Sequence, residues 1–180
     1  LWSGEGSSNP ESALKTLVSR LRVILAQVSP ALAECIVTER GSYRWVTQPG
    51  VSIDLYEFEE LEKRLSTCTE LTEESQRDYQ RALSLYGGNL LQGSEEEWAL
   101  SRSATLHASY LKLVYQYLTL LKAAERYNEI IDVCRAALDV DAFDETLHLQ
   151  LMNALVKTCR NNEALMQYKH VTNLHFRYLG

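Results

Sequence analysis

The sequence has few of the residues that interrupt helices: its 180 positions include eight glycines and three prolines, about 6% of the chain and roughly half the usual share. No apolar run reaches the length of a membrane-spanning helix, and no signal-peptide pattern is present. A Gly-rich phosphate loop, a nucleophile elbow and a Cys/His cluster at metal-ligand spacing are also missing. We therefore expect a mainly α-helical protein that is not an enzyme, needs no cofactor or metal and has no membrane partner.

The cysteines form no C-x-x-C pair and lie in apolar stretches predicted to be helices or strands. This spacing favours reduced thiols in a cytoplasmic protein, where they would pack as small buried hydrophobic residues. The histidines lie on predicted helices, and we expect them to be neutral and at the surface or half buried. These residues are Cys35, Cys68, Cys134 and Cys159, and His107, His148, His170 and His175.

The net charge of −6 argues against a nucleic-acid partner until the charge is divided along the chain. Residues 1–50 carry five basic and four acidic side chains, residues 51–98 carry four and twelve, and residues 99–180 carry nine and eight. The acidity therefore belongs to the middle of the chain. We expect its carboxylates to face solvent on helices, and a partner surface, such as one for RNA polymerase, is the alternative.

A first amphipathic helix is predicted over about residues 9–28. Asn9 can cap it, Pro10 suits its first position and Pro30 ends it. At 100° per residue, the apolar side chains share an arc of about 120°, and the polar and basic side chains lie opposite. The second face has the chemistry of a helix that reads the major groove, although an ordinary solvated face is the alternative. The apolar residues are Leu14, Leu17, Val18, Leu21, Ile24, Leu25 and Val28, and the others are Ser12, Lys15, Thr16, Ser19, Arg20 and Arg22.

A small β-hairpin is predicted over about residues 35–47, because two short β-prone runs flank a turn at residues 39–42 that contains Gly41. With the preceding helix, this segment resembles the recognition helix and wing of the winged-helix DNA-binding domain of response regulators. It is closest to the version in the Streptomyces antibiotic regulatory protein family, by its residues 18–22 and its Thr38, Gly41 and Tyr43-Arg44.

That resemblance implies DNA contacts for Thr16, Ser19, Arg20 and Arg22 on the recognition helix and for Arg40 on the wing. The helical wheel adds Lys15. The resemblance also implies that residues 1–50 are the C-terminal part of the domain and lack its first helices. The chain then begins inside this domain, with residues 1–2 as the tail of the preceding helix.

Residues 51–180 show the pattern of a helical repeat. A short strand is expected at residues 51–55, then a helix pair within 54–86 with caps at Asp54 and Thr72. A shift of 34 residues, the tetratricopeptide length, aligns Asn128-Glu129 with residues 162–163 and predicts helices at 96–123, 127–139, 144–158 and 161–178. Trp98 is expected to anchor the core. Two small residues are expected to let the helices approach closely, and six larger residues are expected to fill the seams between helices. The small residues are Ala137 and Ala164, and the larger ones are Tyr127, Leu138, Leu151, Leu155, Leu165 and Tyr168.

Three segments of this part, residues 88–98, 147–155 and 163–168, resemble the bacterial transcriptional activator domain in order and content. The two resemblances together imply a cytoplasmic DNA-binding transcriptional activator that recognises promoter DNA. The helical domain would then support dimerisation, contact with RNA polymerase or signal input. The alternative is a tetratricopeptide-like scaffold or sensor that binds a peptide or small ligand without DNA binding by this fragment.

Overall fold

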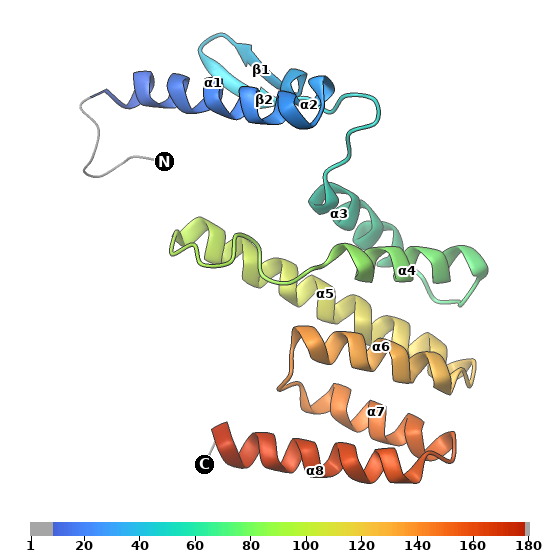
Figure 1. Ribbon diagram of the computed structural model, residues 1–180. Helices are drawn as coiled ribbons and strands as arrows, with labels where there is room; N and C mark the ends of the chain where they lie inside the picture. Colours follow the sequence, from blue (N-terminus) through green and yellow to red (C-terminus); the bar gives the residue numbers. More distant parts are fainter. Residues whose placement is uncertain (1–8, 179–180) are drawn as a thin grey trace. The chain divides into compact units, whose positions relative to one another are not determined.

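The computed structural model describes residues 9–178, apart from the side chain of His175. The chain divides into two compact units, Leu1–Ile53 and Asp54–Gly180. It is mostly helical, with one two-stranded antiparallel sheet in the described part (Figure 1), which confirms the predicted fold class. Within that part, no helix is both long and apolar enough to cross a membrane. The expected helix tail at residues 1–2 lies outside the described residues.

The first unit consists of α1 (Pro10–Val28), α2 (Pro30–Glu34) and a hairpin of β1 (Ile36–Glu39) and β2 (Ser42–Trp45). The predicted helix and hairpin are confirmed, whereas α2 was not predicted from the sequence. Pro30 ends α1 as expected, but it also begins α2, because the first turn of a helix does not need the N–H that proline lacks.

The second unit stacks helices in antiparallel pairs: α3 packs on α4, α5 on α6 and α7 on α8, and α6 also packs on α7 (Figure 1). Successive pairs of this kind form a tetratricopeptide-like architecture. The predicted bounds agree with the structure to within about two residues, as is usual for helix ends. The helices are α3 (Asp54–Leu65), α4 (Glu73–Leu85), α5 (Glu97–Ala123), α6 (Tyr127–Val140), α7 (Glu145–Lys157) and α8 (Asn161–Tyr178).

The turns between α5 and α6 and between α7 and α8 are built alike, 34 residues apart. Each contains a left-handed residue, Glu125 (φ 55°) or Cys159 (φ 59°). The next residue, Arg126 or Arg160, donates its N–H to a carbonyl five positions earlier, at 2.9 and 2.8 Å. Each arginine side chain then pairs with the glutamate three positions later. The repeat seen in the sequence is therefore a repeat of backbone conformation.

Cys159→Gly is expected to raise the free energy of unfolding by about 0.5–1 kcal/mol, because a left-handed backbone strains any residue with a Cβ. Cys159→Ala is the matched control, since it removes the same exposed thiol and keeps the Cβ. Urea unfolding followed by circular dichroism measures both variants. An equal gain from alanine would assign the effect to the thiol and refute the argument from φ.

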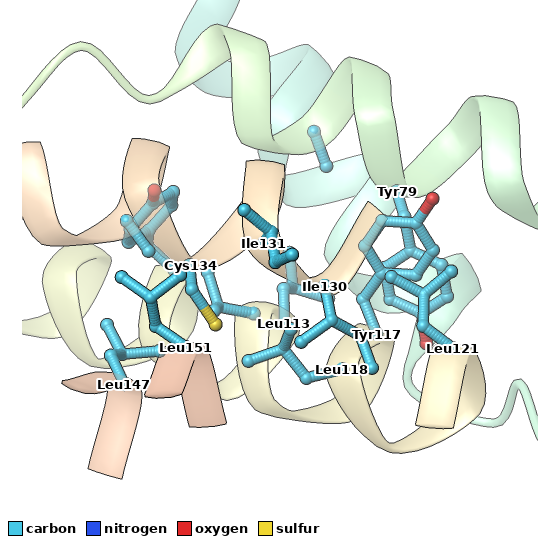
Figure 2. Packing of buried hydrophobic residues seen from close by; sticks show 14 of the residues in the cluster. Tyr79, Leu113, Tyr117, Leu118, Leu121, Ile130, Ile131, Cys134, Leu147 and Leu151 are labelled. Carbon is cyan, nitrogen blue, oxygen red and sulfur yellow. The ribbon is translucent and has the colours of Figure 1, made fainter. Parts of the chain in front are cut away.

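One apolar core runs through the second unit (Figure 2). Tyr79 and Tyr117 lie at one end of the cluster drawn there, and Cys134 and Leu147 lie at the other. The rings of Tyr79 and Tyr117 are stacked, with their centres 4.7 Å apart. The predicted small position at Ala137 is confirmed as fully buried. Gln116 of α5 adds a polar link, since its Nε2 donates to Leu65 O at 3.0 Å and so satisfies a carbonyl at the end of α3.

Two expectations near the start of the second unit are wrong. Residues 51–53 form no strand, and α3 begins directly at Asp54, whose Oδ1 accepts the N–H of Leu55 at 2.8 Å. Trp98 does not anchor the core: it is 56% exposed, and its neighbour Ala99 is buried instead. The first buried residue of α5 is therefore Ala99, one position after Trp98.

The last helix corrects the predicted seam. Leu165 and Tyr168 are 54% and 58% exposed, whereas Ala164 is buried as expected. Cys159 is exposed, so not every cysteine is a small buried residue. His148 is buried more deeply than expected: its Nε2–H donates to Ala142 O at 2.9 Å and its Nδ1 accepts from a glutamine side chain at 2.8 Å.

The acidic stretch is less solvated than predicted, because basic side chains of the same unit pair with it. Arg81 binds both carboxylate oxygens of Glu57, at 2.6 and 2.8 Å, and this hydrogen bonding lowers the pKa of Glu57. Part of the local charge is thereby neutralised. The other pairs are Glu59 with Arg102, Glu62 with Lys112 and Asp78 with Arg64.

Candidate nucleic-acid interface

Helix α1 begins as the sequence predicts. The side chain of Asn9 accepts the N–H of Ser12 at 3.1 Å, and Pro10 occupies the first helical position. Lys15 Nζ lies 2.7 Å from Glu11 Oε1 on the exposed surface, and this hydrogen bond raises the pKa of Lys15 and lowers that of Glu11. The lysine charge is therefore partly offset by a neighbour one turn away.

Three of the predicted contact residues lie farther along the exposed side of α1. Thr16 directs its hydroxyl to Ser12 O at 3.0 Å. Ser19 and Arg20 are exposed, and within residues 9–178 no hydrogen bond or ion pair engages the Arg20 guanidinium. All five of its N–H donors are thus available to a partner, in the fork that suits a phosphate or a guanine edge.

Arg22 is placed differently, because it binds the hairpin. Its Nε and Nη2 donate to Ile36 O at 3.2 and 2.8 Å, and Nη2 also donates to Thr38 Oγ1 at 2.9 Å. Its guanidinium carbon lies 6.0 Å from the centre of the Tyr43 ring, within the range of a cation–π contact. Arg22 therefore joins α1 to both strands, a role that the helical wheel did not reveal.

The hairpin turns sharply at its tip. Glu39 pairs with Ser42 across the sheet, so Arg40 and Gly41 form a two-residue loop, with φ of 49° and 83°. Positive φ at both positions is characteristic of a type I′ turn, which glycine adopts readily. Arg40 is consequently exposed at the outermost point of the hairpin, where its side chain is accessible to a partner.

The apolar face of α1 is covered on one edge and bare on the other. Val18 is buried, and Leu14 and Leu25 are half buried. A second row, which we call the uncovered stripe, has exposed fractions between 44% and 76% and no covering element within the described residues. The uncovered stripe consists of Leu17, Leu21, Ile24 and Val28.

The six predicted contact residues all belong to the first unit. Lys15, Thr16, Ser19 and Arg20 follow the outer side of α1, and Arg22 and Arg40 are associated with the hairpin. Across the described residues, no group of three or more His, Cys, Asp or Glu side chains could hold a metal ion.

A tetratricopeptide-like helical protein with a basic helix and hairpin is thus the class that the fold defines. The family model of the bacterial transcriptional activator domain matches residues 53–180, which is most of the chain. The chain belongs to that family. No curated protein matches it.

Proposed function

We propose that the protein is a DNA-binding transcriptional activator of the Streptomyces antibiotic regulatory protein type, in which α1 is the recognition helix and the hairpin the wing of a winged helix. The observation that carries the proposal is the row of exposed Lys15, Ser19 and Arg20 beside a hairpin with Arg40 at its tip. Membership of a transcriptional activator family supports it.

In this proposal the basic residues divide into two roles. Arg20 donates to a phosphate or guanine in the major groove. Lys15, Thr16 and Ser19 contact the DNA phosphate backbone and so fix the register of α1 on the duplex. Arg40 reaches the neighbouring minor groove. Arg22 acts by positioning, because its guanidinium sets the hairpin against α1 through Ile36 O.

The uncovered stripe supports the winged-helix assignment independently. In a complete winged helix, the helices that precede the recognition helix pack on its apolar side. Four adjacent apolar side chains exposed on α1 match the surface that such helices would cover. The second unit would then serve dimerisation, contact with RNA polymerase or signal input in a cytoplasmic regulator without catalytic activity.

A DNA titration in the full-length protein tests the proposal. A labelled duplex from the promoter of its own gene is titrated at several NaCl concentrations. We expect the logarithm of the association constant to fall linearly with that of the salt concentration, by about 0.9 for each phosphate contacted. Absent or salt-independent binding would refute DNA recognition and favour the alternative, a helical scaffold or sensor that binds a peptide or small ligand.

A further inference from the structure

The second unit contains a groove of about 450 Å³ between α4 and α6, with α5 at its base. We call it the tyrosine groove, because Tyr86, Tyr110 and Tyr117 line it. Apolar side chains such as Val133 complete much of the wall. Its volume falls in the range of sites that bind small molecules, which are mostly apolar with a few placed polar groups.

The aromatic rings of the groove are held in place by packing. Tyr86 stacks on Tyr110 with ring centres 4.5 Å apart, and Tyr117 stacks on Tyr79 at 4.7 Å. The Tyr86 hydroxyl is also fixed, since it lies 3.3 Å from His107 Nδ1. A wall of preorganised tyrosines favours flat apolar ligands and, through the π-face, cations.

One hydroxyl of the groove has no partner. Tyr117 is 1% exposed, and no hydrogen-bonding atom satisfies its OH among the residues that the structure describes. Burial raises the pKa of Tyr117, and Glu129 adds to this, whereas Arg126 and the Gln80 side chain lower it. Gln80 also lines the groove, and its side chain is a polar neighbour that lowers this pKa by hydrogen bonding, although the contact falls short of full hydrogen-bond geometry. Because buried polar groups are nearly always satisfied, this hydroxyl is a donor that a small shift of the groove wall would offer to a ligand.

The two carboxylates of the groove differ. Glu129 is engaged, since Arg126 Nε binds its Oε1 and Gln76 Nε2 donates to its Oε2 at 3.0 Å. Asp132 is exposed, makes no hydrogen bond or ion pair in residues 9–178, and acts on Arg160 only through its charge. Asp132 is therefore the carboxylate that can accept a cation.

We propose that the tyrosine groove binds a small aromatic amine. The ring lies among Tyr86, Tyr110 and Tyr117, the ammonium pairs with Asp132, and a polar substituent reaches the Tyr117 hydroxyl. The occupant is a free small molecule, because the groove needs one compact body with a single positive charge. Such a ligand would give the helical unit an input signal, whether or not the first unit binds DNA.

Four related probes test the proposal by amide NMR titration of the whole chain. Tyramine carries the ring, the ammonium and a hydroxyl; phenethylamine lacks the hydroxyl, 4-ethylphenol lacks the charge, and 3-(4-hydroxyphenyl)propionate reverses it. We expect tyramine to bind most tightly and the anion most weakly, with shifts on α4, α5 and α6. Loss of the hydroxyl should weaken binding about 3- to 10-fold. Equal binding of amine and anion, shifts elsewhere, or no saturation with tyramine would overturn the proposal.

Two variants assign the contacts. Asp132→Asn should weaken tyramine about 2- to 5-fold and leave 4-ethylphenol unchanged. Tyr117→Phe should weaken tyramine but not phenethylamine, since the ring remains. Glu74→Gln, which removes an exposed carboxylate of α4 outside the groove, is the control. If Asp132→Asn weakened both probes equally, the ammonium contact would be wrong. The probe series in the unmodified chain decides the proposal even if a variant does not fold.

Discussion

Leu155→Ala is expected to lower the free energy of unfolding by about 2–5 kcal/mol. Leu155 lies on α7 with 1% of its surface exposed, inside the core cluster of the second unit. Truncation removes three carbons from a packed interior and leaves a cavity that neighbours on adjacent helices can only partly fill. Because each helix pair is stabilised by the next, the loss should spread beyond α7.

Leu165→Ala is the matched control, since it makes the same chemical change ten residues later on an exposed face. We expect it to change stability by no more than about 0.5 kcal/mol. Urea unfolding monitored by circular dichroism gives both values. A loss of more than about 2 kcal/mol from Leu165→Ala would mean that another element covers α8 in solution, as the sequence pattern had suggested.

Local signals explain why most helix bounds could be predicted. Asn9 caps α1, Thr72 forms a reciprocal capping box with Ser75, and Asp144 caps α7 through Leu147 N at 2.9 Å. Each of these caps satisfies N–H groups that a helix start leaves open. The 34-residue period then supplied the pairing of helices, because equivalent turns use the same backbone conformation.

Burial was harder to predict, because periodicity identifies an apolar face without saying whether anything covers it. Leu155 and Leu165 both fit a helical seam, but only Leu155 is buried, whereas more than half of the Leu165 surface is exposed. The prediction that Trp98 is buried was wrong for the same reason. Val51 and Ile53 have strand propensity, yet a strand also needs a neighbour to pair with, and residues 51–53 have none in the described structure.

For the candidate interface too, helical geometry could be predicted from the sequence, whereas tertiary contacts could not. The wheel placed Lys15, Ser19 and Arg20 on the outer side of α1 because that follows from helical geometry alone. The partners of Arg22 depend on where the hairpin folds back, which α2 decides. The short α2 follows Pro30 directly and has no signal of its own beyond that proline. The tyrosine groove was also missed, since Tyr86, Tyr110 and Tyr117 come from positions that no motif connects.

Arg20→Ala is expected to weaken promoter binding by about 1–3 kcal/mol, or about 5- to 150-fold, in the full-length protein. Under the proposed function, its guanidinium gives its donors to DNA, and it has no partner among the described residues to lose. Stability should therefore not change. If Arg20 contacts a phosphate, the salt slope should also fall by about one. Arg177→Ala on α8 controls for the loss of one exposed positive charge.

Arg22→Lys separates positioning from contact. Lysine keeps the charge but cannot fork onto Ile36 O and Thr38 Oγ1 together, so we expect the first unit to lose about 1–2 kcal/mol of stability. Promoter binding should weaken as the hairpin loosens, with the salt slope kept. Amide NMR of the hairpin measures the first effect and the salt titration the second. Unchanged affinity at fixed salt for Arg20→Ala would remove α1 from the interface, whereas an Arg22→Lys variant with an unaltered hairpin and weakened promoter binding would make Arg22 a direct DNA contact.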